Sequence, residues 1–96
     1  MQLRLSRLAE ADVDGIFEYG LVNHGAAAAL AYLDEIEMCY RQLLGYPRSG
    51  RRDVTLGAGL HSLSCRAHRI YYELDGDAVI IQRVLHKSMD AERWLG

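Results

Sequence analysis

The first half of the chain changes from a short alternation of polar and apolar residues to two long stretches with helical spacing. Residues 2–6 alternate, which is typical of a short strand with one buried face. Apolar side chains then recur every three or four positions over about residues 8–23 and again over 26–44, and this spacing predicts two amphipathic helices. The connection at residues 23–25 is so short that the two helices must pack as an antiparallel hairpin.

The second half of the chain has the pattern of strands. Residues 46–59 are rich in glycine and polar side chains and predict a loop, with a short strand near residues 54–56. Runs typical of strands follow over residues 60–65, 69–74 and 78–86.

Two features of these later runs bear on the architecture. Asp75-Gly76-Asp77 is typical of a hairpin turn between the last two strands. The strand over residues 78–86 is apolar on both faces, so we expect it in the middle of a sheet and covered on both sides. A last short helix is predicted over about residues 88–95.

The predicted order, β-α-α-β-β-β-α, describes a single α+β domain over residues 1–96: an antiparallel sheet with a helical hairpin packed on one face. A hairpin covers only one face of a small sheet. The other face of the strand at residues 78–86 therefore needs a cover. We expect the C-terminal segment around Trp94 to supply part of it and a partner polypeptide to supply the rest.

The charges are unevenly distributed, although the net charge is only −2. Residues 1–47 carry seven acids and three arginines, whereas residues 48–96 carry eight bases and six acids. Ten of the eleven basic residues are arginine, whose planar fork suits carboxylates and phosphates. The basic half can thus face an acidic partner or nucleic acid, or take part in ordinary surface ion pairs.

The sequence does not indicate a metal-binding, membrane-spanning or secreted protein. Cys39 and Cys65 have no metal-ligand spacing, so we expect free thiols, no metal and no cofactor. No apolar run approaches the roughly 18 residues of a membrane span, and no signal peptide is evident. These features favour a cytoplasmic protein that does not bind a membrane.

Four short strings occur in order along the chain. They are Ala-Asp-Val-Asp-Gly-Ile-Phe-Glu-Tyr at residues 11–19, Pro-Arg-Ser-Gly-Arg at 47–51, His-Arg-Ile-Tyr-Tyr at 68–72 and Arg-Val-Leu-His-Lys-Ser-Met-Asp at 83–90. With this order of elements, the chain resembles the RelE/ParE toxin family over nearly its whole length, and the ParE branch in particular.

The resemblance implies a function. ParE-like toxins of bacterial type II toxin–antitoxin systems inhibit DNA gyrase, block replication and are neutralised by direct binding of a ParD-like antitoxin in a hetero-oligomer. Such a toxin is a protein inhibitor and not an enzyme, and no direct sequence-specific binding to nucleic acid is expected. The alternative is the RelE branch, whose toxins are ribosome-dependent mRNA endoribonucleases, because a fold does not decide which site it carries.

Candidate site residues follow from this comparison. The expected target-binding residues cluster near the C-terminus and are Arg83, His86, Lys87, Met89, Asp90, Arg93 and Trp94. The expected antitoxin-binding residues are Phe17, Leu33, Tyr40, Arg69 and Tyr71. No catalytic residue is expected for a gyrase inhibitor; for the ribonuclease alternative they are Arg69, Arg83 and His86, with cations stabilising a phosphate.

Two of these residues have more than one interpretation. Strict alternation places Arg83 on one face with Val79, Ile81 and Leu85, where a charge is costly unless paired. An internal ion pair and a binding role both remain open. His86 is interpreted as a partner contact, a general base or a cap at a strand end. The other histidines, among them His68, are expected in surface or turn roles.

Overall fold

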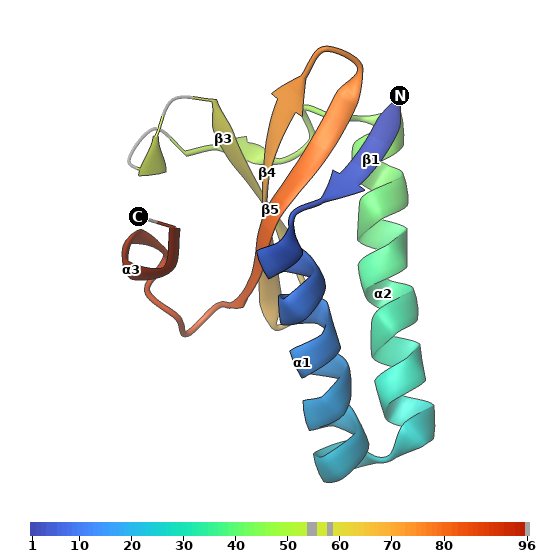
Figure 1. Cartoon of the computed structure of the whole chain (residues 1–96). Helices are drawn as coiled ribbons and strands as arrows, with labels where there is room; N and C mark the ends of the chain where they lie inside the picture. The colour runs from blue at the N-terminus through green and yellow to red at the C-terminus, as the bar shows by residue number, and fades with distance from the viewer. Residues whose placement is uncertain (54–55, 58, 96) are drawn as a thin grey trace.

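A computed structural model describes residues 1–53, 56–57 and 59–95. Within these residues, eight elements form a helical hairpin, a five-stranded sheet and a short C-terminal helix (Figure 1). They are β1 (Gln2–Leu5), α1 (Arg7–His24), α2 (Ala26–Gly45), β2 (Arg51–Arg52), β3 (Leu60–Cys65), β4 (His68–Asp75), β5 (Ala78–His86) and α3 (Ala91–Leu95).

The predicted α+β fold is confirmed, and the element bounds differ only locally. The last helix begins at Ala91, three residues later than predicted. The first strand described after the hairpin is β2, and the strand predicted near residues 54–56 falls mostly on residues that the structure does not describe. Val54 and Thr55 lie outside the described residues, and Leu56 belongs to no strand.

Local chemistry fixes the ends of the hairpin. The Ser6 hydroxyl accepts a hydrogen bond from the backbone N–H of Ala9 at 3.0 Å and thereby caps α1. Gly25 joins the helices with φ of +88°, a conformation that favours glycine. A Cβ atom on Gly20 would lie 3.1 Å from the Cβ of Ala29, so the two helices are in close contact near the turn.

The strand order is β1-β5-β4-β3-β2. Neighbouring strands are antiparallel except β1 and β5, which are parallel, with Leu3 opposite Val79 and Leu5 opposite Ile81. The prediction of an antiparallel sheet is therefore wrong for the pairing of β1 with β5 and confirmed for the other pairs. Because β1 occupies the far side of β5, the first half of β5 has a strand on each side, and its central position is confirmed.

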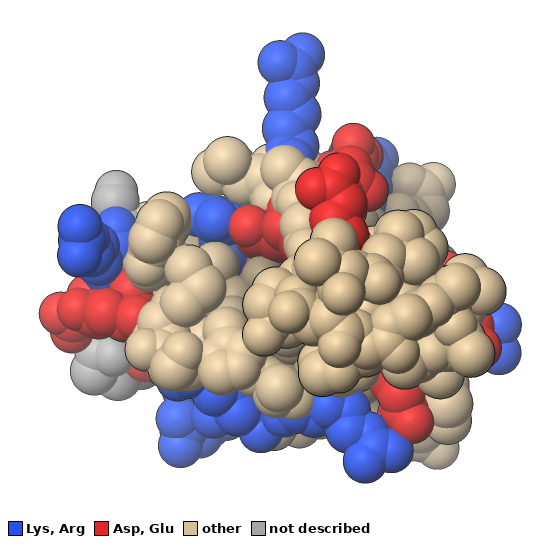
Figure 2. Space-filling view, turned by 90° about the horizontal axis from the view of Figure 1, so that it is seen from below, with Lys and Arg blue, Asp and Glu red and all other residues tan. Residues whose placement is uncertain are grey.

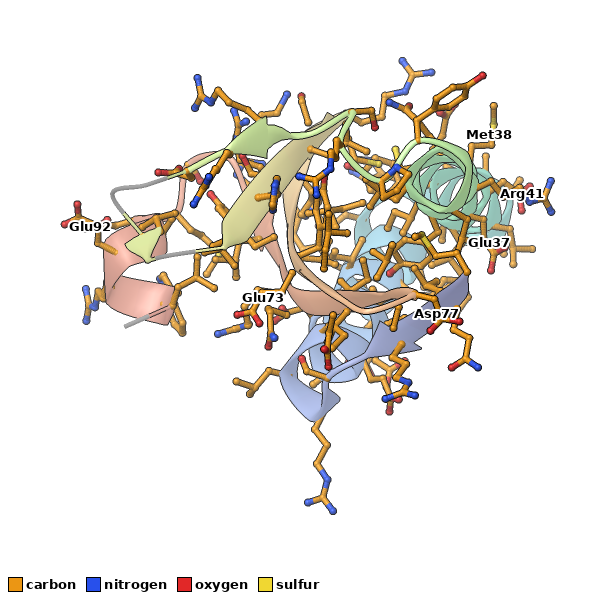
Figure 3. The ribbon with its side chains drawn as sticks, turned by 90° about the horizontal axis from the view of Figure 1, so that it is seen from above. Glu37, Met38, Arg41, Glu73, Asp77 and Glu92 are labelled. Atoms are coloured by element: carbon orange, nitrogen blue, oxygen red, sulfur yellow. The ribbon has the colours of Figure 1, made fainter. Side chains whose placement is uncertain are left out.

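Two apolar clusters lie on opposite faces of the sheet. The larger one packs under the hairpin and includes Ile36, Leu43 and Val79. The smaller one holds Leu60, Tyr71 and Leu85, against which Leu56, Met89, Ala91 and Leu95 pack. Seen from above, α2 lies on one side of the sheet and α3 on the other (Figure 3). The C-terminal segment therefore supplies part of the second cover, as predicted.

A bulge in β5 changes which way its side chains point. Ile81 pairs with Tyr72, but Arg83 pairs with Tyr71, so Gln82 is the extra residue. Val79 and Ile81 belong to the cluster under the hairpin, whereas Leu85 belongs to the opposite one. The expected common face of Arg83 with Val79 and Ile81 is thus wrong, because one inserted residue reverses the alternation; Arg83 keeps only Leu85.

The Pro-Arg-Ser-Gly-Arg string forms the turn after α2, and Tyr72 holds it. The Tyr72 hydroxyl donates to the carbonyl of Pro47 at 2.8 Å and accepts from the backbone N–H of Gly50 at 3.0 Å. A Cβ atom on Gly50 would lie 2.7 Å from the carbonyl oxygen of Ser62. Only glycine fits here, which explains its place in the string.

Candidate functional site

The side chain of Arg83 is held inside the molecule by Asp12 of α1. Its Nε and Nη2 atoms each lie 2.8 Å from a different carboxylate oxygen of Asp12, and the two side chains are only 11% and 14% exposed. Asp12 also accepts the backbone N–H of Val84 at 2.9 Å. The internal ion pair is therefore the interpretation of Arg83 that the structure supports.

Arg83 also links α1 to the C-terminal helix. Its Nη1 donates to the carbonyl oxygen of Trp94 at 3.0 Å, and its guanidinium carbon lies 5.9 Å from the centre of the Trp94 ring. The Asp12 carboxylate beside Arg83 raises the pKa of the guanidinium, which stays charged. Asp12 was not singled out from the sequence, because its partner is 71 positions away.

The other predicted target-binding residues follow Arg83 along one continuous segment. Met89 is half-buried in the smaller cluster, and the Asp90 carboxylate accepts the backbone N–H of Glu92 at 3.2 Å. The side chains that face solvent are His86, Lys87, Asp90, Arg93 and Trp94. Five of the seven predicted residues are thus exposed along one continuous segment of the chain, which runs from the end of β5 through α3.

The predicted antitoxin-binding residues do not form one surface. Tyr40 is buried under the hairpin, while Tyr71 is buried in the cluster on the opposite face of the sheet. Phe17 and Leu33 are half-buried on the helices, and Arg69 is half-buried on β4. The buried tyrosines pack against the chain's own sheet, because an apolar stripe predicts burial without naming what covers it.

The three residues of the ribonuclease alternative are not brought together either. Arg69 and Arg83 lie on the face of the smaller cluster, since they pair with Leu85 and Tyr71. His86 pairs with His68 across the two strands, and the ring of His68 contacts Tyr32 of α2. His86 therefore faces the hairpin. The sheet separates the histidine from the two cations.

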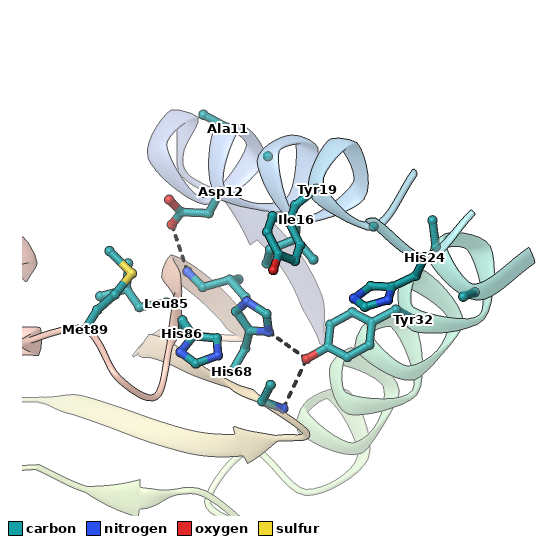
Figure 4. Close-up of a pocket in the computed structure, with 16 residues that line it drawn as sticks. Ala11, Asp12, Ile16, Tyr19, His24, Tyr32, His68, Leu85, His86 and Met89 are labelled. Atoms are coloured by element: carbon teal, nitrogen blue, oxygen red, sulfur yellow. Dashed lines mark hydrogen bonds between the residues drawn. The ribbon is translucent and has the colours of Figure 1, made fainter. Parts of the chain in front are cut away.

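A pocket of about 750 Å³ opens between the hairpin and the ends of β4 and β5 (Figure 4). Its polar side chains include Tyr32, His68 and His86. The Tyr32 hydroxyl lies 2.6 Å from Nδ1 of His68 and accepts the backbone N–H of Ala67 at 3.1 Å. The rings of His68 and His86 meet edge to face, with centroids 5.3 Å apart. This role of His68 was not predicted, because its partners Tyr32 and His86 lie on other elements.

The protonation of this cluster follows from its surroundings. Burial, and then the nearby His86, lower the pKa of His68 below its ordinary value of 6.5. The Nδ1 atom of His86 accepts the backbone N–H of Ser88 at 3.0 Å and lies 2.7 Å from its hydroxyl. The basic nitrogen of His86 is therefore already occupied, which is a poor arrangement for a general base.

The remaining surface shows two contrasting regions. Figure 2, seen from below, shows a broad surface without charge over the tip of the hairpin and basic side chains along one margin. Tyr19, Val22 and Leu30 lie at that tip, and Val22 is 84% exposed. Within the described part of the chain, no cluster of histidine, cysteine or acidic residues could hold a metal ion. None of the described helices is long and apolar enough to cross a membrane.

The family model and the relatives that match this chain are ParE toxins. The model of the family described as "ParE toxin of type II toxin-antitoxin system, parDE" matches residues 3–91. Toxin ParE1 of Caulobacter vibrioides is 37% identical over 93 residues, which cover 97% of this chain and 96% of the relative. Toxin ParE1 of Mycobacterium tuberculosis is 31% identical over 90 residues, with 93% and 92% covered.

Two solved structures share this fold. A chain from "Chromosomal ParDE TA system from P. aeruginosa" has a TM-score of 0.78 at 23% identity, over 90% of this chain and 95% of that one. A chain from the "YoeB-YefM complex from Staphylococcus aureus" has a TM-score of 0.57 at 16% identity, with the same coverage.

The strand order and the hairpin thus define a RelE/ParE-type toxin fold. The chain belongs to the ParE family and is the toxin component of a type II toxin–antitoxin system. The resemblance predicted from the four strings is confirmed.

Proposed function

We propose that this toxin inhibits DNA gyrase by binding it, blocks replication, and is neutralised in the bacterial cytoplasm by a ParD-like antitoxin. The observation that carries the proposal is the solvent-facing segment from His86 to Trp94, in a chain whose family match extends over residues 3–91. The separation of Arg69 and Arg83 from His86 by the sheet counts against ribonuclease chemistry.

The target surface is the C-terminal segment. Lys87 and Arg93 are exposed there, and Trp94 is 47% exposed. Aromatic and cationic side chains of this kind dominate the energetics of protein interfaces. The bonds of Arg83 to Asp12 and Trp94 fix the segment on the body of the toxin, so little ordering free energy is lost when it binds.

Expression of the toxin in bacteria without an antitoxin tests the proposed function. Inducing the toxin in bacteria should stop DNA synthesis first and start a DNA-damage response, and a co-expressed ParD-like antitoxin should restore growth. If protein synthesis stops first, the toxin acts as a ribonuclease and the gyrase proposal is wrong. If no synthesis changes, the chain is an inactive antitoxin partner and the proposal is equally wrong.

Charge reversal tests the surface. The double variant Lys87→Glu and Arg93→Glu should lower toxicity at least tenfold, because both side chains are exposed and belong to the proposed interface. Arg41→Glu is the matched control, since Arg41 is exposed on the far side of α2 (Figure 3). Equal toxicity of the double variant and the control would rule out this surface.

A further inference from the structure

The pocket between the hairpin and the sheet is lined by two imidazole rings, those of His68 and His86, whose Nδ1 atoms both lie within hydrogen-bond distance of other groups. The Tyr32 hydroxyl oxygen accepts from Ala67, so its own proton is available to Nδ1 of His68, 2.6 Å away. A nitrogen that accepts a proton carries none, and a neutral imidazole keeps its proton on the other nitrogen. In the tautomer in which Tyr32 donates to Nδ1, the ring N–H of His68 is at Nε2.

The contacts of His86 indicate its tautomer independently. Its Nδ1 accepts the backbone N–H of Ser88, and a backbone N–H can only donate. Its ring proton is therefore also at Nε2. Among the described residues, neither Nε2–H has an acceptor, although both rings line the pocket (Figure 4). With both Nδ1 atoms occupied and both Nε2 atoms protonated, the pair offers no lone pair to a metal ion but offers two donors to an oxygen.

The rest of the pocket suits an apolar side chain. Small residues of the two helices leave the space open: Gly15, Gly20, Ala28 and Ala29. Ile16, Val84 and Leu85 line it as well. The carboxylate that faces the pocket, Asp12, is already bound to Arg83 and Val84, so it does not compete for the histidine protons.

We propose that this pocket receives a segment of the antitoxin in which an apolar side chain stands next to an aspartate or glutamate, whose carboxylate accepts the Nε2–H of His68 or His86. This inference rests on the proposed function, because it names the chemistry of the toxin's partner. A carboxylate accepts only, holds two oxygens for two donors, and forms stronger hydrogen bonds than a neutral group. The apolar walls supply the area that such a contact buries.

The occupied pocket also explains how one partner silences the toxin. His86 precedes Lys87 directly, so an antitoxin segment bound to His86 lies beside the first basic residue of the target surface. Antitoxin and target then compete for the same end of β5. The antitoxin residue that enters the pocket is therefore an inhibitory contact as well as an anchor.

Two substitutions of His86 separate the donor from the ring. Glutamine keeps an N–H donor at the same reach, whereas leucine keeps apolar volume and removes the donor. The dissociation constant of the purified complex with the co-expressed ParD-like antitoxin is measured for each variant by calorimetry. His86→Leu should weaken binding about tenfold and His86→Gln no more than two- to threefold. Acid-to-amide substitutions in the antitoxin should find one position whose effect disappears in the His86→Leu background.

The outcomes separate the two proposals. Unchanged affinity of His86→Leu, with the wild-type complex intact, overturns the pocket assignment and leaves the toxin function in place. No complex with wild-type toxin overturns the antitoxin proposal and the pocket with it. Self-association of the toxin that His86→Leu abolishes would show a second copy in the pocket and overturn the assigned occupant. Nitrogen NMR of the free toxin, at a pH where the imidazole rings are neutral, should show the Nε2–H tautomer of both rings, and an Nδ1–H form of either ring contradicts the argument.

Discussion

The two faces of the sheet differ in how completely the chain covers them. Among the described residues, ten buried side chains form a continuous core under the hairpin, whereas the face toward α3 holds three. In a chain of 96 residues the first cluster must provide most of the apolar stabilisation. The second face is therefore the part of the molecule that can change, or bind a partner, with less risk to the fold.

The largest expected effect tests this difference directly. Leu43→Ala, in the core under the hairpin, should lower the free energy of unfolding by about 3 kcal/mol, because it leaves a cavity in close packing. Leu95→Ala, at the edge of the smaller cluster, should cost about 1 kcal/mol, since that side chain is only half-buried. Urea unfolding measures both. Equal losses would show that the α3 face is as important to stability as the hairpin face.

Asp12 joins the two faces, and its substitution should have the next largest effect. Asp12→Asn removes the charge that holds Arg83 and should cost about 2 kcal/mol, because a largely buried guanidinium loses its partner. The same variant should loosen α3, which increased hydrogen exchange near Trp94 would reveal. Glu35→Gln is the control: the Glu35–Arg66 pair is solvent-exposed, so unfolding should not change measurably.

A substitution of Tyr40 is expected to leave the free energy of unfolding unchanged or to raise it. Its buried hydroxyl has no hydrogen-bond partner among the described residues, and burial raises its pKa to about 12. Tyr40→Phe should therefore leave stability unchanged or raise it by up to about 1 kcal/mol. Tyr72→Phe, which loses the bonds to Pro47 and Gly50, should destabilise. A Tyr40→Phe variant that instead loses antitoxin affinity would restore Tyr40 to the antitoxin surface.

The smallest expected effect is on pH dependence. The pKa of His68 is lowered in the folded state, so the unfolded chain binds this proton more readily. The contribution of His68 to stability is complete above its ordinary pKa of 6.5 and decreases as the pH falls toward the lower folded value. Urea midpoints across this range should show the decrease in the wild type and a smaller one in His68→Gln. Identical pH profiles would show that His68 is not responsible.

Much of the fold could be predicted, because it depends on local patterns. The helix periods, the Asp75-Gly76-Asp77 turn and the apolar strand over residues 78–86 each carry their structure within a few residues. The parallel pairing of β1 with β5 has no such local signal. The bulge at Gln82 was not predictable either, since it depends on how two strands meet, and it decides the direction of Arg83.

The candidate site was less predictable than the fold. The C-terminal cluster of charged side chains was visible in the sequence, and most of it is exposed as expected. Asp12 and Tyr32 were not visible, because their partners Arg83 and His68 are 71 and 36 positions away. A pattern of apolar positions predicts that Tyr40 and Tyr71 are covered, but only tertiary structure tells whether the cover is the same chain.

The parallel pairing of β1 with β5 delays completion of the sheet until late in synthesis. The first strand to leave the ribosome must wait for one of the last, because residues 2–5 pair with residues 78–81. The core under the hairpin also needs Val79, Ile81 and Val84, so the nascent chain cannot complete it early. At roughly 5–20 residues per second, the delay is on the order of 4–15 s. A translating ribosome thus releases this toxin as a late-folding product, and antitoxin already present can meet it at that moment.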